Sequence, residues 1–383
     1  MDRRGFLMTG AGVAAASFSG WARAAMTETP PRLLILIELR GGNDGLNTVV
    51  PIEDGRYYDL RPRLALRGDA VVPLGPGAAL HGSLAPWLPL WKAGEMAVLQ
   101  GVGYPQPDLS HFRSIEIWDT ASSSREIVQT GWLTRVAETS AVFKAASADG
   151  VILGAADLGP LSGGARAVAL ADAQRFSAQS HLASGAEPPA RGALAHIVRV
   201  ENDVVRAGAE LASTRPLSTE FPRTPFGQAT RQAAMIAGTR RVPVIRITQS
   251  GFDTHQNQLA VQANLLRQVA DGVVALRGAL QEAGVWDDTV VLSYSEFGRR
   301  PRENGSGGTD HGTAGVHFAF GPRVKGGTIY GARPALDRLD ADGNLQHTLD
   351  FRAIYAAIIG QWWKLDPQRA LRGRFNAVPF LEA

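Results

Sequence analysis

The chain of 383 residues contains no cysteine. Disulfide bridges and thiolate metal sites are therefore excluded, and any bound metal must be held by carboxylate oxygens and imidazole nitrogens. Such ligands favour zinc, manganese, magnesium or calcium. The sequence also lacks the His-Glu-x-x-His pattern of many zinc peptidases. Metal-dependent amidase or peptidase chemistry is therefore the least favoured of the reactions considered.

Long apolar runs and an excess of charge are missing as well. No segment of the chain approaches the roughly 18 apolar residues of a membrane-spanning helix, so we expect no transmembrane segment after processing. The formal net charge is only +3. No stripe of basic residues is interleaved with aromatic ones, so we do not expect nucleic acid as a partner. Hydrophobic residues make up 45% of the chain, which is enough for the core of a large globular domain.

The first 25 residues are typical of an export signal. Arg3 and Arg4 precede a weakly apolar run over residues 8–21, and Ala22-Arg23-Ala24-Ala25 follows as a small-residue cleavage pattern. We predict a twin-arginine signal peptide over residues 1–24, recognised by the twin-arginine export machinery. The mature protein is then expected in the periplasm or outside the cell, exported in the folded state.

Short apolar runs alternate with helical patterns along the rest of the chain. This alternation predicts a mostly parallel sheet with right-handed helical crossovers. We predict one α/β domain over residues 25–383, with a partly helical insertion around residues 172–240. The predicted strands cover residues 33–39, 96–103, 151–154, 165–171, 242–247 and 289–294, and the predicted helices cover residues 83–92, 110–119, 192–208, 227–239, 257–283 and 349–362.

Acidic residues and histidines follow the predicted strands. Open α/β sheets bind ligands at the carboxyl ends of their strands, so these side chains are candidates for one metal site. The glycine-rich loop at 305–312 has no packing reason to carry an Asp-His pair, which makes that pair the least ambiguous. The candidate metal ligands are Asp44, Asp253, His255, Glu296, Asp310 and His311.

Each of these residues also has a purely structural interpretation. Asn43 and Asp44 lie in a glycine-rich turn, where Asn and Asp are favoured for their backbone geometry. The alternative for His255 is a hydrogen-bonded structural histidine. Glu296 would be costly to bury without a partner, and Arg299 is the nearest candidate for an ion pair.

Ser110 and His111 begin a predicted helix. The free N–H groups and the positive dipole end of a helix start stabilise an oxyanion, so Ser110 is a candidate nucleophile. The alternative is a plain N-cap serine. Candidate substrate contacts are Asn43, His111, Arg299 and His317, and His111 is also placed to contact the ion. A guanidinium suits phosphate or sulfate oxygens, whereas His317 either supports the site or packs on the next strand.

Together these segments resemble the uncharacterised family called domain of unknown function 1501. Members of that family are often exported by the twin-arginine route, and the family is grouped with the alkaline phosphatase-like superfamily. The resemblance is carried by the export signal and by residues 40–47 (Arg-Gly-Gly-Asn-Asp-Gly-Leu-Asn), 109–112 with Trp118, 251–255, 295–299, 309–312 and 350–355.

The resemblance implies a three-layer α/β/α sandwich with metal ions at the strand ends. It implies Asp44, Asp253, His255 and His311 as metal ligands and Ser110 as the nearest match to the nucleophile. The superfamily's usual Asp-His pair is replaced here by Glu296 and Phe297, so one histidine is missing. The site then holds one ion, or two with Asp310 as a substitute ligand.

These observations predict an exported, metal-dependent hydrolase of phosphate or sulfate esters. The expected substrate is an anionic ester of a small molecule or a glycan. The alternative is a non-catalytic binding protein of the same fold that recognises an anionic cell-envelope ligand or a secreted partner. The missing histidine favours this alternative.

Overall fold

The computed structural model describes residues 32–170 and 216–382. Within them, one large mixed sheet has the strand order β11-β5-β10-β9-β1-β8-β6-β7, with β12 paired to β5 beside this path. Neighbouring strands run parallel except at β10, which is antiparallel to β5 and β9. The strands are β1 (Leu33–Arg40), β5 (Met96–Gly103), β6 (Gly150–Leu153), β7 (Ala167–Leu170), β8 (Val244–Ser250), β9 (Thr289–Tyr294), β10 (Gly315–Phe320), β11 (Thr328–Tyr330) and β12 (Leu349–Asp350).

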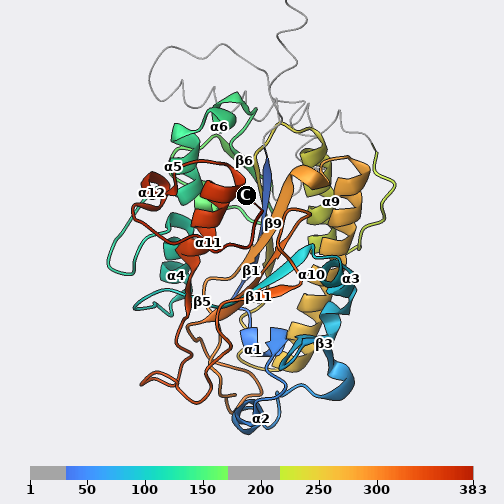
Figure 1. Cartoon of the computed structure of the whole chain (residues 1–383), viewed down its shortest axis with the longest axis vertical. Helices are drawn as coiled ribbons and strands as arrows, with labels where there is room; N and C mark the ends of the chain where they lie inside the picture. The colour runs from blue at the N-terminus through green and yellow to red at the C-terminus, as the bar shows by residue number, and fades with distance from the viewer. Residues whose placement is uncertain (1–31, 171–215, 383) are drawn as a thin grey trace, which may run out of the picture.

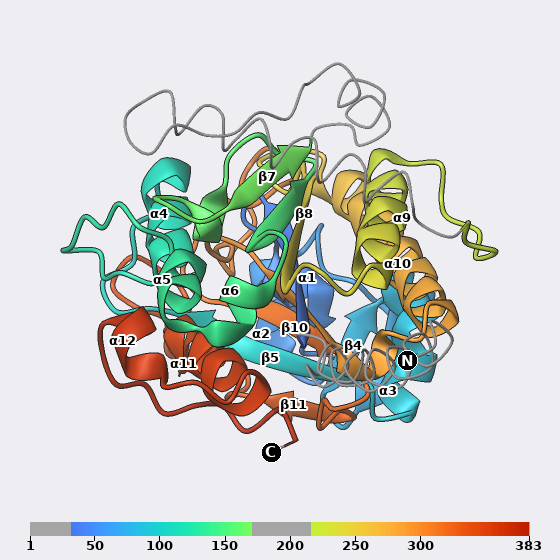
Figure 2. The same cartoon turned by 90° about the horizontal axis from the view of Figure 1, so that it is seen from above.

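Helices cover both faces of this sheet, as Figures 1 and 2 show from two directions. One face carries α3 (Leu88–Lys92), α9 (Pro225–Gly238) and α10 (Gln258–Glu282). The other face carries α4 (His111–Thr120), α5 (Trp132–Thr139), α6 (Ala141–Ala145), α11 (Phe351–Ala357) and α12 (Pro367–Leu371). The predicted three-layer α/β/α sandwich with a mostly parallel sheet is confirmed.

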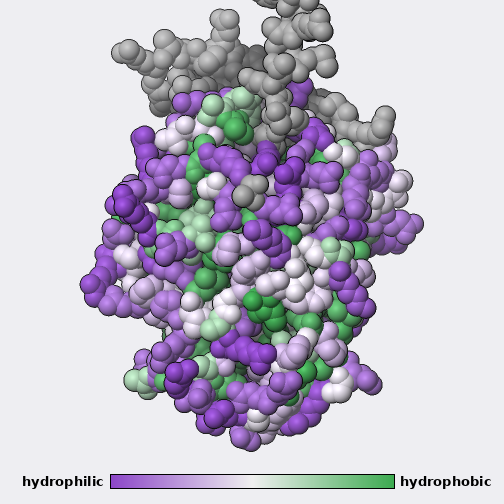
Figure 3. Space-filling model, in the orientation of Figure 1, coloured by the Kyte–Doolittle hydropathy of each residue, from purple (hydrophilic) through white to green (hydrophobic). Residues whose placement is uncertain are grey.

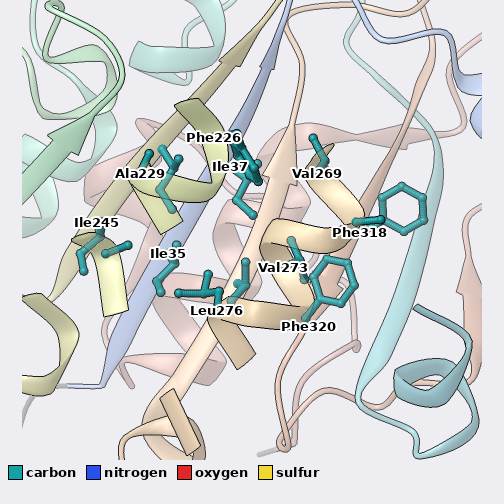
Figure 4. Close-up of a cluster of buried hydrophobic side chains, with 14 of the residues drawn as sticks. Ile35, Ile37, Phe226, Ala229, Ile245, Val269, Val273, Leu276, Phe318 and Phe320 are labelled. Atoms are coloured by element: carbon teal, nitrogen blue, oxygen red, sulfur yellow. The ribbon is translucent and has the colours of Figure 1, made fainter. Parts of the chain in front are cut away.

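Alternation along the central strand β1 divides the apolar core between the two faces. Ile35 and Ile37 pack under α9 and α10, as Figure 4 shows, whereas Leu34 and Leu36 pack on the opposite side. Successive side chains of a strand point to opposite faces, so a strand buried on both faces is apolar throughout. This explains why residues 33–39 form a nearly unbroken apolar run.

A second, smaller sheet lies beyond the carboxyl end of β1. Its strand order is β2-β4-β3, with β2 (Val49–Val50), β3 (Val71–Gly75) and β4 (Ala78–His81). The short helices α1 (Gly45–Thr48) and α2 (Gly55–Leu60) accompany it. Residues of these elements, including Leu46, Val50 and Tyr57, form a separate apolar cluster. The small sheet, α1 and α2 together cover the polar turn that follows β1.

Most predicted elements are present, and the differences have local causes. The predicted helix over 83–92 is a 3₁₀ helix (Gly82–Trp87) followed by α3, because Pro86 and Pro89 lack the N–H groups that a regular helix needs. The predicted helix over 349–362 divides into β12, α11 and a π-helical turn (Ile358–Trp362). The strand β10 was not predicted. The predicted export signal and the helix over 192–208 lie outside the described residues.

Among the described helices, none is long and apolar enough to cross a membrane. On the face shown in Figure 3, hydrophilic and hydrophobic residues are intermixed. Such a mixture is usual on protein surfaces.

Candidate active site

Three loops and one helix start meet at the carboxyl ends of β1, β8 and β9. These strands are neighbours with β1 in the middle, and both pairings are parallel. Their following loops therefore emerge at one edge of the sheet. Gly41 has φ +119°, and a Cβ atom on it would collide with the backbone of Phe252 and Asp253. Only glycine permits this close approach between the loops after β1 and β8.

Asp253, His255 and His311 bring three potential ligand atoms together. The Oδ1 atom of Asp253 lies 3.0 Å from Nε2 of His255 and 3.2 Å from Nε2 of His311, and the two Nε2 atoms are 3.0 Å apart. Bonds of about 2.0–2.2 Å to zinc place neighbouring ligand atoms about 3–3.5 Å apart. The spacing therefore fits the ligand shell of a small divalent cation.

His111 adds a third imidazole to this group, which we call the histidine cluster (His111, Asp253, His255 and His311). Its Nε2 atom lies 3.5 Å from Oδ2 of Asp253. His111, Asp253 and His311 offer ligand atoms that all lie within 4.8 Å of one another. The sequence analysis placed His111 among the substrate contacts, whereas the structure places it in the cluster.

Every imidazole of the cluster is oriented by an oxygen acceptor on its other nitrogen. Nδ1 of His111 is 2.7 Å from Oε1 of Glu296, and Nδ1 of His255 is 3.3 Å from Oδ1 of Asp310. Nδ1 of His311 is 2.8 Å from the carbonyl oxygen of Leu109. Carbonyl and carboxylate oxygens only accept hydrogen bonds, so each of these oxygens can hold an Nδ1–H, and Nε2 is the ring nitrogen that faces Asp253. This pairing is typical of metal-bound histidine.

Glu296 and Asp310 thus lie behind the histidines. Glu296 is buried, and its carboxylate also accepts a hydrogen bond from the backbone N–H of Gly41 at 2.9 Å. A hydrogen bond from Asn304 lowers the pKa of Asp310, so this carboxylate is ionised and can accept. The structure places both predicted ligands where they orient an imidazole instead.

Arg299 is fully buried and uses its donors within the protein. Its Nε donates to the carbonyl of Gly42 at 2.8 Å, and Nη1 donates to that of Thr309 at 2.9 Å. Nη2 donates to Oδ1 of Asp253 at 2.6 Å and also reaches the carbonyl oxygens of Gly41 and Phe252.

The predicted substrate contact through Arg299 is therefore replaced by a structural role that ties three loops together. The partner of Arg299 is Asp253 and not Glu296. Burial alone would raise the pKa of Asp253, but the hydrogen bond and charge of Arg299 outweigh it and lower the pKa to about 2.

Asp44 is not part of the histidine cluster. Its carboxylate is buried and forms a two-pronged ion pair with Arg61, at 2.5 Å from Nη1 and 3.0 Å from Nη2. It also caps α1 by accepting from the backbone N–H of Leu46, and it accepts from the amide of Gln258. The guanidinium of Arg61 supplies the positive charge that the sequence analysis assigned to a metal ion at Asp44. Nothing in the sequence around Arg61 indicated this pairing.

Asn43 and His317 also lie away from the cluster. The side-chain oxygen of Asn43 accepts a hydrogen bond from Thr48 at 3.1 Å within the buried turn. His317 is buried in β10 with its ring edge-on to Trp118, and burial lowers its pKa to about 3. Of its two interpretations, the structure supports packing on the next strand.

Ser110 is the exposed N-cap residue of α4, and its hydroxyl group makes no hydrogen bond with a described residue. Its two neighbours both contact the cluster, since the carbonyl of Leu109 accepts from His311 and the next residue is His111. Ser110 is therefore beside the histidine cluster.

Comparison with protein families identifies the chain. The model of a protein family of unknown function, DUF1501, matches residues 96–375. The chain belongs to this family. Phe297, which stands where the resemblance led us to expect a histidine, packs against the rings of both His111 and His311 at centroid distances of 4.8 and 4.6 Å. In this DUF1501 protein, the third imidazole comes from α4 instead.

Several solved structures are similar to this DUF1501 chain at low sequence identity. The phosphonate monoester hydrolase SpPMH from Silicibacter pomeroyi is 12% identical with a TM-score of 0.46, covering 91% of this chain and 76% of that chain. The PsFucS1 sulfatase from Pseudoalteromonas sp. is 11% identical with a TM-score of 0.44, covering 96% and 75%. A magnesium-bound mutant of TAB5 alkaline phosphatase is 12% identical with a TM-score of 0.36, covering 79% and 94%. No curated protein matches the chain in sequence.

Proposed function

We propose that this DUF1501 protein is an exported, metal-dependent hydrolase of phosphate or sulfate esters, with one divalent ion at the histidine cluster. The observation that carries the proposal is the orientation of the three imidazoles. Each Nδ1 faces an oxygen acceptor, and each Nε2 faces the carboxylate of Asp253. A divalent cation in this position would be held by the three deprotonated Nε2 atoms and the carboxylate, with each Nδ1–H hydrogen-bonded to an oxygen as is usual for metal-bound histidine.

The residues of the cluster favour one kind of ion. His111, His255, His311 and Asp253 would hold it, and three imidazoles with one carboxylate favour zinc over magnesium or calcium. A divalent ion supplies Lewis-acid polarisation of the ester oxygen. Because Arg61 neutralises Asp44, a second ion would lack that ligand, and we expect one ion per chain.

The start of α4 offers a place for the remaining ester oxygens. The backbone N–H groups of His111, Phe112 and Arg113 have no hydrogen-bond acceptor among the described residues, and the side chain of Ser110 does not cap them. Free N–H groups at a helix N-terminus bind anions. The Ser110 hydroxyl, beside these groups, is the candidate nucleophile, with a water molecule as the alternative.

The metal content tests the first part of the proposal. Protein purified with zinc, manganese, magnesium and calcium present is expected to retain about one equivalent of divalent metal and to cleave chromogenic phosphate or sulfate esters, as the chemistry of such sites requires. Elemental analysis and an ester panel measure both. Metal-free protein after this purification, or loaded protein inactive on every ester, would contradict the proposal.

The replacement of Ser110 by alanine separates catalysis from binding. For a hydrolase with a serine nucleophile, Ser110→Ala is expected to reduce turnover by at least about 100-fold, as the loss of an activated nucleophile does, and to leave the metal content unchanged. Steady-state rates and elemental analysis give the two values. Unchanged turnover would assign the attack to water.

A non-catalytic binding protein remains the second candidate. The Asp44–Arg61 ion pair favours it, because a carboxylate that the resemblance assigns to a metal ion is here neutralised by the protein itself. Such a protein would bind vanadate or sulfate equally well with and without Ser110, and it would turn over no ester in the panel.

A further inference from the structure

A separate cavity of about 620 Å³ lies along α4. We call it the α4 pocket, and it is lined by Arg40 at the end of β1, Phe112 and Asp119 of α4, Val128, and the loop over 157–162. None of the residues of the histidine cluster lines it. Its volume lies within the range of about 300–1,000 Å³ that is usual for small-molecule sites.

The α4 pocket is lined by residues that are chain neighbours of the candidate site. Phe112 follows His111 in the chain, and Arg40 precedes Gly41, whose N–H donates to Glu296 at 2.9 Å. An ester at the cluster would enter the pocket with its alcohol part if it extended along α4.

One wall of the pocket is apolar and open. Phe112 is 90% exposed although it is a large aromatic residue, and Ile115, Val128 and Leu158 line the same cavity. An exposed aromatic ring at the mouth of a concave site offers a flat surface for a ring-shaped ligand.

The charged residues of the pocket are already paired. Arg40 contacts Asp157 at 2.8 Å, and Glu116 contacts Arg113 at 2.9 Å. Asp119 has no ion-pair partner among the described residues, and burial raises its pKa to about 8, which favours its uncharged form. The pocket therefore offers no free charge to an ionic ligand.

Asp119 is nonetheless an unsatisfied polar group. Asp119 is only 7% exposed, and its Oδ1 atom is already closed to solvent without a hydrogen-bond partner. Its other carboxyl oxygen has no hydrogen-bond partner among the described residues either, and a purely apolar ligand in the pocket would cover it without supplying one, which is unfavourable. A ligand that is apolar on one face and carries hydroxyl groups at its edge would pack its apolar face on Phe112 and form a hydrogen bond with Asp119.

We propose that the α4 pocket binds an uncharged sugar ring that carries the ester group, with Phe112 against the apolar face of the ring and Asp119 hydrogen-bonded to a ring hydroxyl. The inference rests on the proposed esterase function and narrows its substrate class. It concerns residues that take no part in the histidine cluster, so the pocket assignment and the proposed esterase function can fail independently of each other.

Unesterified sugars test the α4 pocket separately from catalysis. Methyl β-glucoside, methyl β-galactoside and N-acetylglucosamine are titrated into the full-length metal-loaded protein by calorimetry or saturation-transfer NMR. At least one is expected to bind, and Phe112→Ala and Asp119→Leu are each expected to weaken that binding at least about 5-fold, in line with losing a stacking or hydrogen-bond contact. Ile127→Ala is the matched control, because Ile127 is 82% exposed and does not line the pocket.

A second measurement uses phosphate and sulfate esters of the bound sugar. Phe112→Ala is expected to raise KM and to leave kcat nearly unchanged, since Phe112 would hold the alcohol part and not the reacting atoms. If sugars bind as expected but no ester is cleaved, the proposed function fails and the pocket assignment stands.

Three results would overturn the pocket assignment. The first is that none of the three sugars binds, and the second is that their binding affinity does not change in Phe112→Ala. The third is that phenol binds more tightly than any sugar and keeps its affinity in Asp119→Leu, which would make the occupant an apolar ring.

Discussion

The variant His311→Ala is expected to lose its divalent metal and at least about 1,000-fold in ester hydrolysis. The Nε2 atom of His311 lies 3.2 Å from Oδ1 of Asp253 and 3.0 Å from Nε2 of His255, so its removal takes one potential ligand from the centre of the cluster. A ligand lost from a site of about four donors leaves a weak site, and the Lewis acid on which the reaction depends is lost with it. Elemental analysis after dialysis and initial rates on the best ester give the two values.

Two further variants make this result specific. His347→Ala removes a partly exposed imidazole that has no hydrogen bond, ion pair or ring contact with a residue of the cluster, and it is expected to change neither value. Glu296→Ala removes the acceptor that orients His111, and such a loss typically weakens metal binding about 10–100-fold. Should His311→Ala keep its metal and its rate, the histidine cluster is not the metal site.

The variant Arg61→Ala is expected to destabilise the fold by about 3–5 kcal/mol, because it leaves the buried carboxylate of Asp44 without its cation. The side chains of Arg61 and Asp44 are 0% and 1% exposed, so water does not replace the lost partner. Chemical unfolding followed by circular dichroism measures the difference. The matched control is Arg56→Ala in α2, whose pair with Asp54 is solvent-exposed and is expected to contribute less than about 1 kcal/mol.

A double variant identifies the cause of the destabilisation. Combining Arg61→Ala with Asp44→Asn removes the uncompensated charge, so part of the lost stability should return. A metal ion at Asp44 would give the opposite pattern, with Arg61→Ala binding a second equivalent of metal. If Arg61→Ala neither loses stability nor binds additional metal, the buried ion pair is not formed.

Much of the fold followed from local patterns. The apolar runs at β1, β5 and β9 are continuous because these strands are buried on both faces, and α10 has apolar residues at helical spacing. The strand β10 was missed, since a short run containing His317 carries no clear strand signal. Its antiparallel direction is set by pairing with β5 and β9 and not by its own residues.

The candidate site was also predicted only in part from the sequence. The sequence predicted that Asp253, His255 and His311 would lie together, because parallel neighbours deliver their loops to one edge of the sheet. The place of His111 in the cluster depends on the packing of α4 beside the loop after β9. Its hydrogen bond to Glu296 joins residues that are 185 positions apart.

What the sequence determined by itself was the edge of the sheet at which the chemistry gathers, since periodicity and loop composition are local properties of the chain. What only the tertiary structure decided was which carboxylates face the imidazoles. Asp44 and Asp253 look alike in the sequence and both pair with buried arginines, but only Asp253 also faces the imidazoles. The partner of a buried charge is set by packing between distant segments, and no local pattern encodes it.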